Sequence, residues 1–150
     1  MSTAAIIGII SQDDSAKFIY CHNDGTPDRL GYILYHFYSN VDRLNSLIDG
    51  GDISSLGSKL DPDEGYEHSF DNPQEDVTVF YHRDRGEDWI DCVPLTYLPY
   101  SWSEEEKGSI AGTGILYTYI FDEKNFQWEL YIDGKRMPAI YMSDDGVRYF

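Results

Sequence analysis

The sequence predicts an α+β fold: an antiparallel sheet, rich in hairpins and ending in a C-terminal meander, with one or two helices packed on one face. Three observations favour it. Two β-rich runs open the chain, apolar residues then recur at helical spacing, and the last third alternates strand-like runs with tight-turn residues. A chain of 150 residues, 41% of them hydrophobic, can bury one core, so we expect a single domain over residues 1–150.

The first two strands are expected to form a hairpin. Residues 4–11 and 17–22 are β-rich, and the short segment between them consists mostly of turn formers. A helix start follows at Thr26 and Pro27. A threonine side chain can accept a backbone N–H bond at the N-cap, and proline suits the first helical position.

Helical spacing then continues over residues 30–48, where apolar residues recur every three or four positions. Asn40 can cap a second, shorter helix, so this segment predicts either one helix or two. Gly50 and Gly51 are expected to end it, because glycine tolerates the backbone conformation that terminates helices.

The middle of the chain is less regular. Residues 52–76 predict mainly loop, and a connection of this length in a compact domain is either functional or mobile. Residues 77–82 alternate apolar and polar side chains, as a strand does. Residues 89–102 are apolar but contain Pro94 and Pro99, which favours a short edge strand and an irregular segment.

The last third has the clearest strand pattern. Residues 114–121 and 126–132 are separated by a polar turn, and the Asp-Gly dipeptide at 133–134 predicts a tight turn into residues 135–142. A short strand over residues 147–150 is expected to close the chain.

The charge of the chain restricts its partners. It has 27 acidic against 11 basic residues, a formal charge of −16 at pH 7, and no Lys or Arg lies between Lys59 and Arg83. Phosphate backbones and anionic membranes repel such a chain. Direct binding to nucleic acid or to a membrane is therefore not expected, and a partner recognised through charge should be basic.

The sequence also predicts a compartment. It has no run of ~20 apolar residues and no signal-peptide pattern, so we expect a cytoplasmic protein. Cys21 and Cys92 are then expected to be reduced thiols rather than a disulfide.

Three segments together carry a resemblance. Residues 19–28 are Ile-Tyr-Cys-His-Asn-Asp-Gly-Thr-Pro-Asp, residues 51–56 are Gly-Asp-Ile-Ser-Ser-Leu, and residues 81–88 are Tyr-His-Arg-Asp-Arg-Gly-Glu-Asp. The chain thereby resembles a family of small acidic proteins encoded by bacteriophages and related mobile elements. It departs from that pattern at Asn23 and Thr26, where the family has aromatic residues. The resemblance implies a phage-type protein and brings no assigned chemistry.

The leading hypothesis is a non-enzymatic inhibitor of phage type, a viral anti-defence protein such as an anti-CRISPR, that uses its acidic surface as a DNA mimic. Ordered carboxylates can imitate a phosphate track and occupy the Lys- and Arg-lined groove of a host nuclease or defence complex. The candidate partner-binding residues are acids with interleaved aromatic anchors: Asp61, Asp63, Glu64, Tyr66, Glu67, Phe70, Asp71, Glu75, Asp76, Trp102, Glu104, Glu105 and Glu106. The alternative is a solvated face that only secures solubility.

A second hypothesis is a small hydrolase or nucleotide-modifying enzyme. Its site would contain two His–Asp groups, each at the end of a predicted strand, which could converge if those strands pair. The residues that would carry the chemistry are His22, Asp24, His82, Asp84 and Arg85, and Arg83 and Asp88 complete the cluster. The alternative is structural: the first group caps the following helix and the second forms an ion-pair network within its turn.

No metal or cofactor is expected. The spacing of Cys and His matches no zinc pattern, and an EF-hand loop starting at Asp61 has Tyr66 in place of the required glycine and Asn72 in place of the bidentate glutamate. The sequence also lacks a nucleophile elbow and a phosphate-binding Gly-rich loop. A third hypothesis is a homo-oligomeric phage accessory protein, such as a homodimer, in which the sheet edge pairs with another copy.

Overall fold

The computed structural model describes residues 2–110, 112, 114–138, 140–143 and 146–149. The helical elements are η1 (Pro27–Gly31, one π-helical turn), α1 (Tyr32–Phe37), α2 (Val41–Asp49), α3 (Trp89–Cys92) and α4 (Glu104–Ser109). The strands are β1 (Ala5–Ile10), β2 (Ala16–Cys21), β3 (Ile53–Ser55), β4 (Val79–Phe80), β5 (Leu95–Tyr97), β6 (Tyr117–Asp122), β7 (Gln127–Ile132), β8 (Lys135–Arg136), β9 (Ile140–Ser143) and β10 (Gly146–Tyr149). Among the described helices, none has the length and apolar character that a membrane crossing requires.

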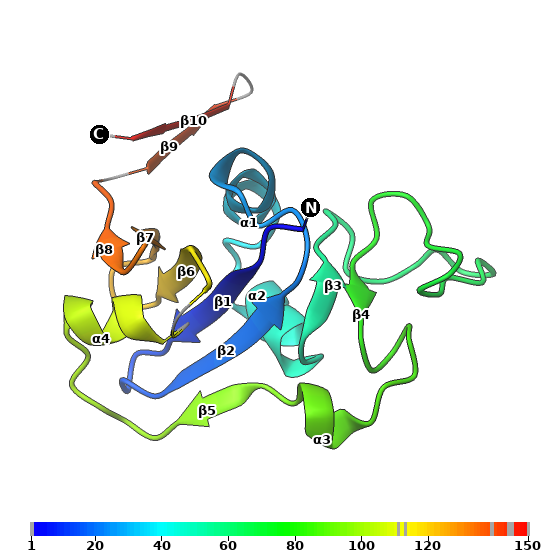
Figure 1. Cartoon of the computed structure of the whole chain (residues 1–150), viewed down its shortest axis with the longest axis horizontal. Helices are drawn as coiled ribbons and strands as arrows, with labels where there is room; N and C mark the ends of the chain where they lie inside the picture. The colour runs from blue at the N-terminus through cyan, green and yellow to red at the C-terminus, as the bar shows by residue number, and fades with distance from the viewer. Residues whose placement is uncertain (1, 111, 113, 139, 144–145, 150) are drawn as a thin grey trace.

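The strands β1 to β8 form one sheet in the order β4-β3-β2-β1-β6-β7-β8, with β5 pairing β2 beside β3, and β9 pairs β10 separately (Figure 1). The predicted α+β class, the N-terminal hairpin and the meander β6-β7-β8 are confirmed. The prediction of a fully antiparallel sheet is wrong, because β1–β6 and β2–β3 are parallel. Parallel pairing needs a crossover of about a dozen residues or more, and η1, α1 and α2 supply one between β2 and β3.

Side chains on the two faces of the sheet enter two different cores. Ile7 and Ile9 of β1 belong to the larger core, which η1, α1 and α2 cover, as expected for helices on one face. Ile6 and Ile10 alternate with them and belong to a smaller core that includes Trp102. The segment leading into α4 therefore covers part of the second face, which the sequence did not predict.

The helical segment is interrupted in the way that Asn40 predicts. The Asn40 side chain accepts a hydrogen bond from the Arg43 N–H at 3.1 Å and so caps α2. Gly51 follows the helix with φ +84°, the left-handed conformation in which glycine is favoured. The prediction of a side-chain cap at Thr26 is wrong: the residue precedes η1 in extended conformation without a cap bond, and its carbonyl accepts from the Leu30 N–H at 2.8 Å.

Several boundaries differ from the prediction. Strand β3 lies inside the segment expected to be loop, and the strand expected over residues 77–82 is reduced to β4. Strand β5 is the expected short edge strand, whereas α3 and α4 were not predicted. The expected strand over residues 135–142 is divided into β8 and β9 around Pro138.

Candidate functional site

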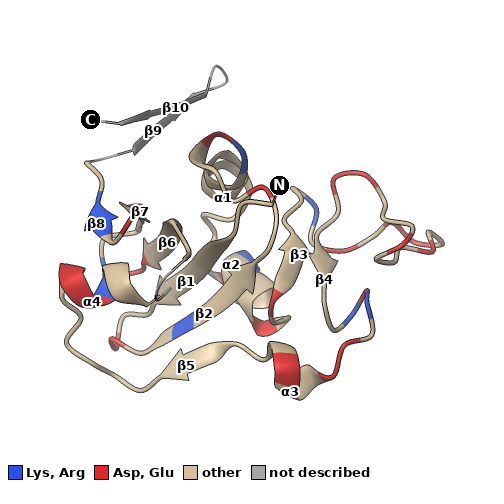
Figure 2. Ribbon diagram, in the orientation of Figure 1, with Lys and Arg blue, Asp and Glu red and all other residues tan. Residues whose placement is uncertain are grey.

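The acidic loop, which we define as residues 61–76, lies between β3 and β4 and contains no helix or strand. All of its carboxylate side chains are exposed. They belong to Asp61, Asp63, Glu64, Glu67, Asp71, Glu75 and Asp76. Figure 2 shows acidic residues gathered along this loop, at the opposite end of the molecule from α4.

The imidazole of His68 anchors the middle of the acidic loop. Only 1% of this side chain is exposed. Its Nδ1 accepts a hydrogen bond from the Gln74 N–H at 2.9 Å, and its Nε2 lies 3.2 Å from the Thr78 carbonyl and 3.3 Å from Oδ2 of Asp84. Because Nδ1 accepts, the ring proton is on Nε2 and points toward these two oxygens. One buried ring thus joins the loop to the residue just before β4 and to the turn after β4.

Asp84 provides the second buried anchor, with 4% of its side chain exposed. Its carboxylate accepts hydrogen bonds from the Phe80 N–H at 2.8 Å and from the Arg83 guanidinium at 2.8 and 2.9 Å. Arg83 also donates to the Leu60 carbonyl and to Oδ1 of Asp61, where the loop begins. A buried carboxylate needs such partners, so this pairing fixes the turn and the start of the loop together.

Hydrogen bonds at the base of the loop hold its two ends together. Tyr38 is fully buried, and its hydroxyl donates to the Gly57 carbonyl at 2.7 Å. The Gly57 N–H donates to Oγ1 of Thr78 at 3.1 Å. A parallel bridge joins Lys59 to Val77 on either side of the loop. The loop therefore leaves and re-enters the fold at one fixed place.

Asp63 illustrates how the loop orders its own carboxylates. Oδ2 of Asp63 accepts from the Gln74 side-chain amide at 2.6 Å, and Lys59 lies 3.3 Å from Oδ1. The hydrogen bond from Gln74, and then the bond and the charge of Lys59, lower the pKa of Asp63 below its usual value. Asp63 is therefore ionised at neutral pH and held in one orientation.

Most of the loop charge is not neutralised. Asp61 pairs with Arg83 and Asp63 with Lys59. Among the described residues, no ion pair involves the remaining carboxylates, which are those of Glu64, Glu67, Asp71, Glu75 and Asp76. The loop thus has an anchored backbone and a negative charge that is largely uncompensated.

The aromatic residues predicted to accompany these charges divide into two groups. Tyr66 and Phe70 are on the loop with 42% and 39% of their surface exposed, and Arg85 stacks 4.6 Å from the centroid of the Phe70 ring. Trp102 lies elsewhere, packed on Phe18 in the smaller core, with its Nε1 donating to a backbone carbonyl at 3.0 Å. It is therefore a core side chain rather than a neighbour of the loop.

The second predicted acidic cluster is also separate. The first turn of α4 contains Glu104, Glu105 and Glu106. The positive end of the helix dipole stabilises carboxylates at this position. Glu104 pairs with Arg136 at 2.9 Å. The structure therefore does not bring these acids into one surface with the acidic loop (Figure 2).

The first His–Asp group is at the end of β2 and forms only local contacts. Nδ1 of His22 lies 2.7 Å from the Tyr20 hydroxyl, and Asp24 is 3.5 Å from Arg29. Neither side chain makes a capping hydrogen bond to η1 in the described structure. Asp24 lines a cavity of about 550 Å³ together with the last residues of the acidic loop.

The second group occupies the turn after β4. Nδ1 of His82 lies 2.8 Å from the Glu87 carbonyl, and Arg85 pairs with the Glu87 carboxylate at 3.1 Å. Asp88 precedes α3 and accepts a backbone hydrogen bond at its carbonyl. No hydrogen bond or ion pair between described residues joins this group to the first, and no cluster of three metal-ligating side chains occurs there. The convergence that an acid–base enzyme needs is not observed.

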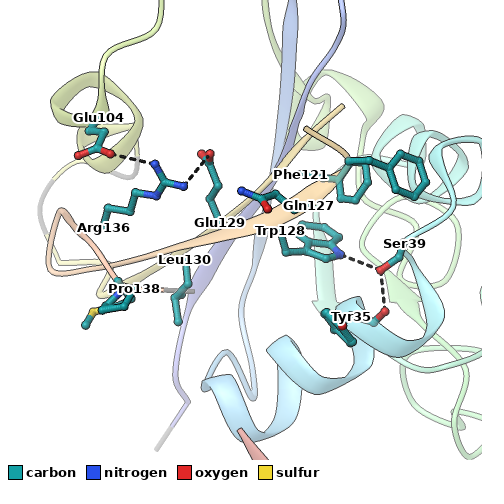
Figure 3. Close-up of a pocket in the computed structure, with 12 residues that line it drawn as sticks. Tyr35, Ser39, Glu104, Phe121, Gln127, Trp128, Glu129, Leu130, Arg136 and Pro138 are labelled. Carbon is teal, nitrogen blue, oxygen red and sulfur yellow. Dashed lines mark hydrogen bonds and ion pairs between the residues drawn. The ribbon is translucent and has the colours of Figure 1, made fainter. Parts of the chain in front are cut away.

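A groove of about 840 Å³ runs beside β7 (Figure 3). The Arg136 guanidinium lies between two carboxylates, 2.9 Å from Glu104 and 3.4 Å from Glu129. On the other side, Trp128 donates from Nε1 to the hydroxyl of Ser39 at 3.2 Å. The charged groups of this groove are bound to one another, and they hold α4 and β8 against the sheet.

Sequence reasoning missed His68, Gln74 and Thr78, which order the acidic loop. A histidine in the middle of a segment rich in carboxylates is a weak signal of a buried anchor, because the pattern does not show which side chain turns inward. The acids from Asp61 to Asp76 were predicted as a partner-binding surface. The structure adds the interior contacts that anchor the loop carrying them.

Comparison with known proteins adds no further assignment. No family model matches the chain, and neither the curated proteins nor the solved structures contain a match.

Proposed function

We propose that this protein is a non-enzymatic inhibitor that presents its acidic loop to a basic nucleic-acid-binding site of another protein. One observation carries the proposal. The buried pair of His68 and Asp84 fixes the loop from within, while most of its carboxylates remain exposed and unpaired. A loop whose charges served only to keep the protein soluble would not need these buried contacts to anchor it.

An anchored loop suits this task for a thermodynamic reason. Binding a mobile loop would cost the entropy of ordering it, whereas the anchored loop is already ordered. Its charge also attracts a positively charged groove over a distance and speeds association, most strongly at low ionic strength. Tyr66 and Phe70 add exposed aromatic surface next to these charges, as interfaces favour.

The biological setting in the proposal comes from sequence. The resemblance of residues 19–28 and 81–88 to phage-encoded proteins suggests action in the cytoplasm of a bacterial host, against a nuclease or a defence complex. Blocking the basic groove of such a protein would prevent it from binding its nucleic acid.

The test is affinity capture from a bacterial lysate with the wild-type protein and with a loop variant, at low and high salt. The loop variant carries Asp63→Asn, Glu64→Gln, Glu67→Gln and Asp71→Asn. We expect the wild type to retain a basic nucleic-acid-binding protein that duplex DNA displaces. Because each exposed ion pair contributes about 0.2–1 kcal/mol, loss of four should weaken binding roughly 4- to 1000-fold at low salt.

A control variant removes the same number of charges outside the loop. It carries Asp28→Asn, Asp42→Asn, Glu105→Gln and Asp133→Asn, all at exposed positions. It should bind like the wild type. Equal loss in both variants would show a general charge effect, and undiminished binding of the loop variant would exclude the acidic loop as the interface.

A further inference from the structure

Exposed apolar side chains are concentrated along α3, β5 and the residues that follow, a segment that we name the apolar strip (residues 89–102). Its exposed members are Trp89, Ile90, Val93, Leu95, Tyr97, Leu98 and Tyr100. Ile90 and Leu98 are 78% and 86% exposed. Large contiguous apolar patches are rare on monomeric proteins, and they usually mark an interaction surface.

The apolar strip has a single charged residue, Asp91, near its start. Residues 92–103 contain no charged side chain, although 25% of the residues in the protein are charged. Asp91 lies within the strip and Asp88 just before it, both at the α3 end. The centre of the strip has no carboxylate with which a basic partner could pair. Charge attraction therefore does not select the molecule that binds there.

Strand β5 gives the strip a free backbone edge. It pairs with β2 on one side, at residues 16–18, and no other described strand pairs with it. In Figure 1, β5 and α3 form the lower border of the molecule. An unpaired edge strand is a template for a strand of another chain.

We propose that the apolar strip is a homodimer interface in which the β5 strands of two copies pair edge to edge. A second copy fits the strip because it offers the same uncharged stretch, residues 92–103, and the same free strand edge. Two chains of charge −16 repel each other, and an uncharged surface is where they approach at the lowest electrostatic cost.

Symmetry further reduces the repulsion. A twofold axis that relates one strand edge to itself makes the two strands antiparallel. The Asp88 and Asp91 carboxylates of one copy then lie at the opposite end of the interface from those of the other copy. Pro94 and Pro99 flank β5 and limit the ladder, because proline has no N–H to donate. Because β2 occupies the other edge of β5, twofold pairing uses the one free edge of each copy and is closed at two copies.

The test is sedimentation equilibrium of the full chain over a wide concentration range, at low and high salt. We expect a monomer–dimer equilibrium that shifts toward dimer as salt screens the repulsion. Leu98→Asp places a charge at the most exposed position and, by symmetry, places it twice in the dimer. It should weaken dimerisation at least ~100-fold, and Ile90→Asp should act in the same direction.

The control is Leu116→Asp, which charges another exposed apolar side chain just before β6, a strand that β1 and β2 separate from β5. It should dimerise like the wild type, and circular dichroism should show all variants folded. Hydrogen exchange of the amides of residues 95–98 should slow as the wild-type concentration rises. A wild type that remains monomeric in high salt, or a Leu98→Asp variant that dimerises normally, would overturn the proposal. Protection of the strip only after another protein is added would assign it to that partner instead.

Discussion

Replacing His68 with alanine should open the acidic loop while leaving the sheet folded. The ring is almost completely buried and makes three contacts, to the Gln74 N–H, the Thr78 carbonyl and the Asp84 carboxylate. Alanine removes all of them and leaves a cavity in their place. The loop carboxylates repel one another, so little else would hold this segment once the anchor is absent.

The magnitude follows from these contacts. Each lost hydrogen bond costs about 1 kcal/mol net, and a buried group left without a partner costs about 1–3 kcal/mol. The Asp84 carboxylate keeps its bonds from Phe80 and Arg83, which limits the damage there. We therefore expect the loop to open more easily by about 2–4 kcal/mol, which is a roughly 30- to 1000-fold larger open population.

Native-state hydrogen exchange measures this opening directly, since the Gln74 amide is protected by the His68 ring. The Gln74 amide should exchange faster in the variant, whereas the amides of β1 and β6 should change little. His36→Ala is the matched control, because His36 is an exposed histidine on α1. Unchanged exchange at Gln74, or an equal effect in the His36 variant, would refute the assignment of His68 as the anchor of the loop.

Three further predictions concern the folded core. Burial raises the pKa of Cys21 to about 12 in the folded protein. The stability that goes with this shift is fully present below the pKa of the thiol in the unfolded chain. It is lost as pH rises from that pKa toward the folded-state pKa, because only the unfolded thiol ionises there. Unfolding free energy from urea titrations should therefore fall by up to about 4 kcal/mol between about pH 9 and pH 12, and Cys21→Ala should flatten this slope. A Cβ added at Gly8 would overlap the Phe18 ring, so Gly8→Ala should lower the unfolding free energy by about 3 kcal/mol, and a neutral result would contradict the packing of the smaller core. Lys107 lies 2.9 Å from the buried Glu129, and thermal melting of Lys107→Met should show a loss of about 2 kcal/mol, which Glu129→Gln in the same chain should partly restore.

Local features of the fold could be predicted from sequence where a residue acts on its own neighbours. The Asn40 cap depends on the Arg43 N–H three residues later, and the turn at 133–134 depends on two residues with positive φ. Both were predicted, because these interactions are encoded within a few positions. The edge position of β5 was predicted for the same reason, from the prolines that flank it.

Features that depend on distant pairing could not be predicted in this way. The apolar run of β1 is compatible with parallel or antiparallel neighbours, and its parallel pairing with β6 joins segments more than a hundred residues apart. Strand β3 has only three residues and gains its stability from β2 and β4 on either side. The inward direction of His68 likewise depends on Asp84, which the sequence shows only as part of a charged turn.

The two proposed surfaces respond to ionic strength in opposite directions, and this separates them in one experiment. Attraction between the acidic loop and a basic groove weakens as salt screens it, whereas pairing of two highly negative chains through the apolar strip strengthens. A salt titration of the wild type should therefore raise the dimer population while it releases a captured basic partner. The loop variant, which carries four fewer negative charges, should dimerise more readily at low salt even as its partner binding declines. If both associations weakened together with salt, charge would govern the apolar strip as well, and its assignment to a second copy would fail.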